Sequence, residues 1–104
     1  MAEMLNVIIK APGKAPTHRT IPNTLDALQE IVGGFVQAVT LPEGLVILMN
    51  EEGKFMRLRP NFNFRNDIVV GNVIFCGHDE EQFADCPWSI EELEKKIRYN
   101  TWMD

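Results

Sequence analysis

The sequence LPEGLVILMNEEG, residues 41–53, contains an apolar run between two turns, and it decides the architecture of the chain. Residues 45–49 are almost continuously apolar, which is typical of a central strand that is covered on both faces. The Pro-Glu-Gly before this run favours a turn. Asn50 and Gly53 occupy the first and fourth positions that a type I turn prefers. We therefore expect a central strand whose antiparallel neighbours are reached through short turns.

Further strands are predicted on both sides of this run. Residues 35–41 alternate well enough for the strand before it. Residues 54–58 are expected to pair back after the second turn as a hairpin. Residues 60–66 mix turn formers with aromatic residues and are interpreted as a loop. Residues 67–76 then form another apolar strand, in which Gly71 marks a bulge or a close approach of backbones.

The N-terminal part predicts a β-hairpin. Residues 5–10 are apolar and rich in β-branched side chains, and a cluster of Pro and Gly at residues 12–16 ends this strand. Residues 17–21 are the expected partner strand. Pro16 and Pro22 on either side confine this partner to an edge of the sheet, because proline cannot donate to a strand ladder.

A first helix is predicted over residues 25–32, where Leu, Ile and Val recur at helical spacing. Asn23 and Thr24 can cap its start by accepting a backbone N–H. Gly33 and Gly34 can end it, because glycine takes the left-handed conformation readily.

The C-terminal helix has the clearest local signal of the chain. Ser89 and Glu92 have the spacing of a capping box. Trp88 and Leu93 can form the hydrophobic staple around it. The apolar face of this helix is expected to comprise Ile90, Leu93 and Ile97.

Together these elements predict one α+β domain over residues 1–104, with a mostly antiparallel sheet of about five to six strands and two helices. One helix follows the first hairpin and the other is C-terminal. Hairpin turns between neighbouring strands favour antiparallel pairing. We expect both helices to cover one face of the sheet.

The composition indicates an ordinary globular domain. The chain has 104 residues, of which 45% are hydrophobic and 24% are charged, and its formal net charge is −5. Its longest apolar runs are far shorter than the ~20 residues of a membrane span, and no basic-then-apolar leader pattern opens the chain. We therefore expect a small acidic cytoplasmic protein that binds neither membranes nor nucleic acid nonspecifically.

The negative charge is concentrated at the C-terminal end. Residues 1–78 hold seven acids and seven bases, whereas residues 79–104 hold eight acids and three bases. This acidic segment could offer a negative face to a basic partner. The other interpretation is a solvated surface of a small domain.

Metal and thiol chemistry has little support in the sequence. Cys76, His78 and Cys86 invite a zinc interpretation, but structural zinc needs four ligands and His18 is far away in the chain. Two unlinked thiols are the favoured interpretation, and a disulfide or a metal is the alternative. Cys76 ends an apolar strand pattern, as expected of a small core residue. We expect no metal and no cofactor.

No catalytic constellation is found, so we expect that the protein is not an enzyme and has no catalytic residues. The acid pairs at residues 51–52 and 80–81 lie in turn-like contexts and are expected to be solvated. Gly33 and Gly34 follow a helix and do not open one, and no standard phosphate-binding loop occurs.

Residues 54–65 are the candidate ligand-binding segment, because they combine bases, side-chain amides and aromatic rings that suit an anionic or aromatic ligand. The candidate binding residues are Arg57, Arg59, Asn61, Asn63 and Arg65. The favoured alternative is a core-anchored segment in which the phenylalanines pack inward.

Four segments resemble a family of small proteins from phages and mobile elements of Gram-positive bacteria, a domain of unknown function. They are NTLDALQEIVGG at residues 23–34, LPEGL at 41–45, NEEGK at 50–54 and DIVVGNV at 67–73. The resemblance covers about residues 4–77 and leaves the acidic C-terminal part outside. It implies an intracellular accessory protein and supplies no catalytic residues.

The leading hypothesis is a non-enzymatic protein-interaction module with a protein partner. The alternative is a protein that binds or sequesters an anionic, nucleotide-like small molecule. A homodimer is compatible with the sequence, through the proline-flanked edge strand and a Trp102 that we expect to be exposed.

Overall fold

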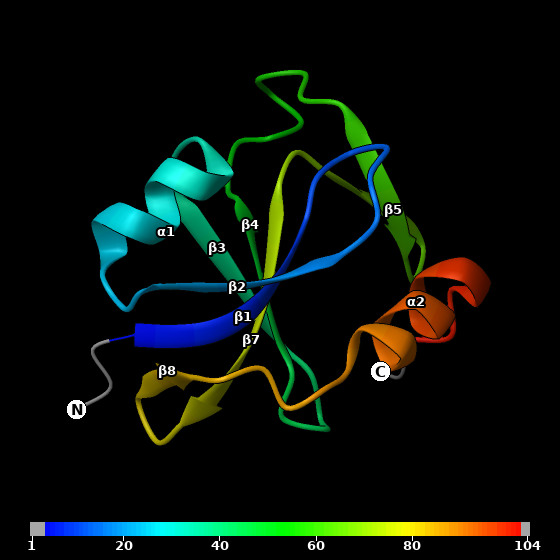
Figure 1. The fold of residues 1–104 in the computed structure, drawn as a ribbon. Helices are drawn as coiled ribbons and strands as arrows, with labels where there is room; N and C mark the ends of the chain where they lie inside the picture. The colour runs from blue at the N-terminus through cyan, green and yellow to red at the C-terminus, as the bar shows by residue number, and fades with distance from the viewer. Residues whose placement is uncertain (1–3, 103–104) are drawn as a thin grey trace.

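The computed structural model describes residues 4–102 and shows an α+β domain (Figure 1). Its elements are β1 (Met4–Lys10), β2 (Thr17–Pro22), α1 (Leu25–Val32), β3 (Val36–Thr40), β4 (Val46–Asn50), β5 (Pro60–Phe64), β6 (Asp67–Val70), β7 (Val73–Asp79), β8 (Gln82–Ala84) and α2 (Ile90–Tyr99). The predicted fold class, with two helices and a mostly antiparallel sheet, is confirmed.

The main sheet has the strand order β2-β1-β7-β4-β3, and β8 pairs with the far end of β7. All its pairings are antiparallel. Phe75 on β7 is the centre of the sheet, since it lies opposite Ile8 on one side and Ile47 on the other. A second, two-stranded sheet pairs β5 with β6.

The two helices cover opposite faces of the main sheet, so the expectation of one covered face was wrong (Figure 1). Along β7 the side chains alternate between two cores: Phe75 belongs to one cluster and Ile74 to the other. Leu93 of α2 packs in the Phe75 cluster, and Leu28 of α1 in the Ile74 cluster. Because the central strands are apolar on both faces, each face needs its own cover.

The predicted strand at residues 54–58 was wrong, because the chain there folds into successive turns. The Met56 amide donates to Glu52 O at 2.9 Å, and the Leu58 amide donates to Gly53 O at 3.0 Å. These local bonds use backbone groups that a strand would offer to a neighbour. Arg57 has φ 58°, a left-handed conformation that interrupts extended backbone.

The predicted loop at residues 60–66 and the single strand at residues 67–76 were also wrong. The first is strand β5 with a tight turn, and it pairs with β6 in a hairpin. Phe62 and Phe64 alternate inward on β5 and are buried, as the core-anchored interpretation predicted. Gly71 has φ +76° and separates β6 from β7, and a Cβ there would lie 2.8 Å from Leu58 Cδ1.

The predicted caps are confirmed. Thr24 Oγ1 accepts from the Ala27 amide at 3.2 Å, and Gly33 ends α1 in the left-handed region with φ 82°. Ser89 and Glu92 form the reciprocal capping box of α2. The two N-caps, Thr24 and Ser89, each contribute about 1 kcal/mol to helix stability.

Trp102 is buried, with 8% of its surface exposed, so the expectation that it is exposed was wrong. Its Nε1 donates to Asn63 O at 3.1 Å, and its ring lies 5.2 Å from the Phe64 ring and 6.4 Å from the Trp88 ring. The indole therefore ties the end of the chain to β5.

Strand β8 was missed by sequence reasoning, since three residues are too short to show a pattern. The segment after it runs beside β1, where the Asn6 amide donates to Asp85 Oδ1 at 2.8 Å and the Cys86 amide to Asn6 O at 2.8 Å. Gly77 permits this approach, because a Cβ there would lie 2.5 Å from Asp85 O.

Candidate functional site

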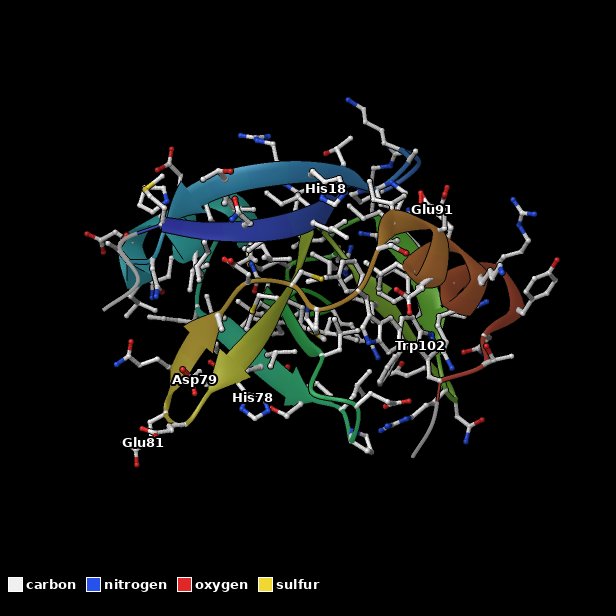
Figure 2. All side chains as sticks on the ribbon, turned by 60° about the horizontal axis from the view of Figure 1, so that its bottom comes forward. His18, His78, Asp79, Glu81, Glu91 and Trp102 are labelled. Carbon is white, nitrogen blue, oxygen red and sulfur yellow. The ribbon has the colours of Figure 1, made fainter. Side chains whose placement is uncertain are left out.

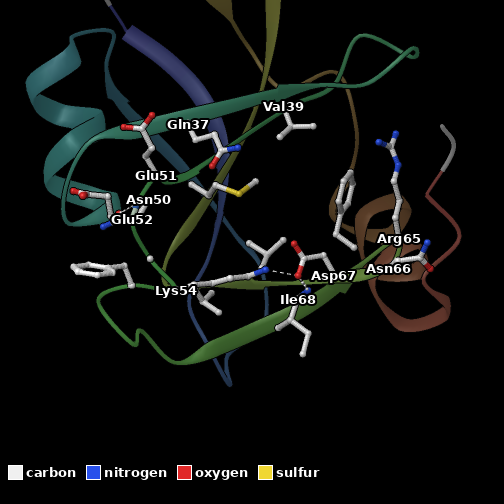
Figure 3. Close-up of a pocket in the computed structure, with 16 residues that line it drawn as sticks. Gln37, Val39, Asn50, Glu51, Glu52, Lys54, Arg65, Asn66, Asp67 and Ile68 are labelled. Carbon is white, nitrogen blue, oxygen red and sulfur yellow. Dashed lines mark hydrogen bonds and ion pairs between the residues drawn. The ribbon is translucent and has the colours of Figure 1, made fainter.

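A groove lies between the β3–β4 pair, the turns at residues 51–55 and the β5–β6 hairpin (Figure 3). Its volume is about 880 Å³. The position follows from the fold, because the hairpin stands over one face of the main sheet and the edge strand β3 borders the space between them. A groove of this kind is a default place to look for a binding site.

The walls of the groove are largely apolar. Val39 and Met49 are partly buried and pack against the Phe75 cluster. At the groove's margin, Phe55 is 87% exposed and Ile68 is 46% exposed. An aromatic side chain so exposed beside an apolar hollow loses favourable burial unless another molecule covers it.

Charged side chains surround this apolar lining. Lys54 and Asp67 form an ion pair across it, and the hydrogen bond from Lys54 lowers the pKa of the Asp67 carboxyl, which also accepts from the Ile68 amide. Glu51 and Glu52 are exposed at one end (Figure 3). Since Lys54 and Asp67 neutralise each other, that end of the groove is acidic.

The opposite end carries Arg65, in the turn between β5 and β6 (Figure 3). Its guanidinium carbon lies 4.7 Å from the centroid of the Phe64 ring. The Arg65 amide donates to Asn100 Oδ1 at 2.9 Å, and Asn100 Nδ2 donates back to Arg65 O at 3.0 Å. This reciprocal pair fixes the turn to the end of α2.

The structure does not bring the five predicted ligand-binding residues into one site. Arg65 lines the groove, whereas Arg59 lines a hollow beside α1 with Lys14 and Glu30. Arg57 is exposed in the turns before β5, and the Asn63 side chain is exposed on β5. Alternation along a strand and a left-handed turn send these side chains in different directions.

Asn61 has a structural position that sequence reasoning did not anticipate. Its Oδ1 accepts from Lys10 Nζ at 2.8 Å, and its Nδ2 donates to Lys10 O at 2.9 Å and to Gly71 O at 2.8 Å. Burial lowers the pKa of Lys10, whose side chain is only 9% exposed. Asn61 therefore joins β5 to the end of β1.

Sequence reasoning missed Glu51 and Glu52 as groove residues, whereas it included Phe55 among the aromatic rings of the candidate segment 54–65. The acid pair was interpreted as part of a solvated turn, and both residues are exposed. The available signal was an aromatic residue inside a polar, turn-rich segment, where it has no strand or helix face to bury it.

Cys76 and Cys86 are free thiols. Burial in the core raises the pKa of Cys76 to about 12, and burial also raises the pKa of Cys86, whose Sγ lies 3.6 Å from Trp88 O. Raised pKa values keep both thiols protonated and poorly nucleophilic. His78 lies exposed near the end of β7, and His18 lies on β2 (Figure 2).

In the described residues 4–102, no cluster of three or more His, Cys, Asp or Glu has the arrangement of a metal site. The C-terminal acids are divided between two places: Asp79 and Glu81 lie at the β7–β8 hairpin, and Glu91 lies on α2 (Figure 2). Over the same residues, no helix is both long and apolar enough to cross a membrane.

The structure is thus a small α+β domain with a largely apolar groove that charged side chains border. The model of the family described as Domain of unknown function (DUF3846) matches residues 4–98, and the chain belongs to this family. The match extends beyond the region of the sequence resemblance and includes most of the acidic C-terminal part. Neither a curated protein nor a solved structure matches the chain.

Proposed function

We propose that the chain is a non-catalytic protein-interaction module whose contact surface is the groove between the β3–β4 pair and the β5–β6 hairpin, with its exposed margin. The observation that carries this proposal is Phe55, 87% exposed beside an apolar hollow of about 880 Å³. Aromatic side chains placed in this way are typical anchors of protein interfaces.

The chemistry of the groove suggests what the partner presents. Its apolar walls fit an apolar side chain, and exposed Glu51 and Glu52 favour a basic residue next to it. A net charge of −5 acts in the same direction, since it attracts basic partners at long range. The proposed partner is therefore a protein surface with an apolar residue flanked by Lys or Arg.

The charged groups of the groove support binding better than catalysis. Lys54 and Asp67 hold each other in an ion pair, and Glu51 and Glu52 are exposed. A general acid or base needs a pKa tuned close to the working pH, whereas the pKa of Asp67 is lowered. We therefore assign no reaction to this surface.

Affinity capture with matched variants tests the proposal. The immobilised chain is exposed to a lysate of the cell that encodes it, beside Phe55→Ser and Tyr99→Ser. Tyr99 is 65% exposed at the end of α2, does not line the groove, and serves as the control. We expect a protein that Phe55→Ser loses and Tyr99→Ser retains. Equal capture by all three forms would contradict the proposal.

The second candidate is an anionic, nucleotide-like ligand, supported by Arg65 at one end of the groove. A thermal-shift screen with nucleotides and phosphorylated metabolites tests it, because a ligand of the native state raises the apparent stability. A shift that Arg65→Ala removes and Arg57→Ala keeps would favour this candidate.

We also propose, from the resemblance in the sequence, a cytoplasmic accessory role in a phage or mobile element of Gram-positive bacteria. Neighbouring genes of phage or transposon type would support that origin. A chromosomal setting among housekeeping genes would contradict it.

A further inference from the structure

We propose that the outer edge of β3 is a self-association site, at which a second copy of this chain pairs with β3 as an antiparallel strand. The strand order of the main sheet ends at β3, and within residues 4–102 β4 is the strand that pairs with it. The proposal goes beyond the partner-binding groove and does not depend on it.

The ladder between β3 and β4 determines which backbone groups are available. The Glu51 amide donates to Phe35 O at 2.8 Å, and the Leu41 amide donates to Leu45 O at 2.8 Å. In the register of this pair, Phe35 and Leu41 are six residues apart, so the odd-numbered residues between them also face β4. Val36, Ala38 and Thr40 therefore point their N–H and C=O groups outward.

The side chains of β3 do not hinder pairing. The strand reads Val-Gln-Ala-Val-Thr, with no charge and no proline. Natural edge strands usually carry charges, prolines or bulges that block edge-to-edge contact. A strand that lacks these features leaves its outward N–H and C=O groups available for pairing.

The same backbone pattern fixes the register of the proposed pair. With Ala38 opposite Ala38 of the second copy, Val36 lies opposite Thr40 and each outward N–H meets an outward C=O. Gln37 then lies opposite Val39 on the groove face. The arrangement is two-fold symmetric, as an isologous interface requires.

The flanking residues favour this arrangement. Phe35 is 63% exposed, and in this register it lies opposite Leu41 of the second copy, which is buried in its own core, and diagonally opposite Val39, which is half-buried on the same face. Pairing therefore gives an exposed aromatic ring an apolar neighbour. A foreign strand would not necessarily present such a residue at this position, whereas a second copy always does.

The charges at the strand ends are partly complementary. Glu51 follows β4 and lies beside the start of β3, where its amide donates to Phe35 O. Figure 3 shows Arg65 beyond Val39, toward the other end of β3. Two-fold pairing brings the Glu51 end of one copy toward the Arg65 end of the other. Exposed Glu43, in the turn after β3, weakens this attraction, so the backbone ladder and Phe35 carry most of the pairing.

The pairing also enlarges the groove. The two-fold axis of an antiparallel strand pair is perpendicular to the sheet, so both copies present the same face on the same side. Gln37 and Val39 line the groove on that face. The grooves of the two copies therefore join into one continuous groove across the interface between the two β3 strands. Because a five-residue edge buries little area, the dimer is expected to be weak and concentration-dependent.

Sedimentation and amide hydrogen exchange on the full chain test the proposal. Over about a hundredfold range of protein concentration, we expect a monomer–dimer equilibrium. As the dimer forms, the amides of Val36, Ala38 and Thr40 should gain protection. The amides of Gln37 and Val39, already bonded to β4, should change little.

Substitutions at Ala38 separate the backbone from the side chain. Ala38→Pro removes an outward N–H and leaves the β4 ladder intact, and we expect the dimer dissociation constant to rise by at least about tenfold. Ala38→Val keeps the N–H and should remain within about threefold of the wild type. If Ala38→Pro fails to fold, Ala38→Lys places like charges opposite each other and should likewise raise the dissociation constant by at least about tenfold.

Three results would overturn the proposal. They are a monomer at every concentration, a dimer that Ala38→Pro and Ala38→Lys both leave intact, and outward amides that gain protection only when a different protein binds. None of these results bears on partner capture through Phe55, so failure here is distinguishable from failure of the proposed function.

Discussion

The two outer strands of the main sheet, β2 and β3, differ in how their open edges are protected. β2 carries exposed His18 and Arg19, begins directly after Pro16 and ends at Pro22. β3 has neither charge nor proline. Charge and proline suppress edge-to-edge pairing. The proline-flanked strand, where the sequence suggested self-association, is therefore the protected edge, and the strand in the middle of the chain is the open one.

The two edges also differ in how they are anchored. β2 has one fully buried side chain, Ile21, at 4% exposure, in the cluster with α1. β3 has no buried side chain, and Val36 and Val39 are only half-buried. An edge that contributes little to its own core keeps its apolar surface available to another molecule.

The largest predicted effect on stability comes from the difference in anchoring between β2 and β3. Ile21→Ala should lower the free energy of unfolding by about 3 kcal/mol, because it leaves a cavity in a closed core. Val36→Ala should lower it by about 1 kcal/mol, because the site is already partly hydrated. Urea unfolding at low protein concentration measures both. Equal losses would remove the distinction between the edges.

Two asparagines of β5, Asn61 and Asn63, provide a second test, at the end of β1, the strand next to β2. Asn61→Ala should destabilise the chain by about 2 kcal/mol, because it removes the acceptor of a buried lysine and the donor to two carbonyls. Asn63→Ala, whose side chain is exposed, should change stability by less than about 0.5 kcal/mol. Thermal unfolding of both variants is the measurement, and a reversed order would refute this assignment.

A thiol at the centre of the sheet, between the two edges, makes the stability of the protein depend on pH. Burial raises the pKa of Cys76 from its ordinary value of 9.0 to about 12. The unfolded thiol therefore ionises first, and this contribution to stability is complete below pH 9.0 and is lost as the pH rises toward 12. At pH 10 the expected loss is about 1.4 kcal/mol.

Chemical unfolding between pH 8 and 10 tests this expectation, and Cys76→Ala is the control. The variant is less stable at every pH, so the comparison uses the slope of stability against pH. The slope should be flatter in the variant. Parallel slopes would contradict the role of Cys76.

Replacing the charged side chains that protect the β2 edge should have the smallest effect on stability. The test is the double substitution His18→Val with Arg19→Val, made in the Ala38→Pro background so that β3 cannot pair. It alters exposed residues and should shift the free energy of unfolding by less than about 0.5 kcal/mol. It should nevertheless create new self-association, visible by sedimentation. A variant that stays monomeric would show that charge is not what protects this edge.

Sequence reasoning predicted the elements that have strong local signals. The caps at Thr24 and Ser89 and the central run at residues 45–49 were confirmed, because each depends on neighbouring residues alone. The loop prediction at residues 60–66 was wrong because Phe62 and Phe64 become strand residues only when β6 and Trp102 cover them. For the candidate site, sequence placed Arg65 in a binding segment, but it could not show that Arg57 and Arg59 point elsewhere.

The sequence by itself determined the fold class, both helices with their caps and the apolar centre of the sheet, because capping and periodicity act over a few residues. Only the tertiary structure decided that the helices lie on opposite faces, that Trp102 is buried and that Phe55 lies beside a groove. It alone also identified β3 as the open edge. These properties depend on contacts between segments distant in the chain, such as β5 with the end of α2, and local patterns do not encode them.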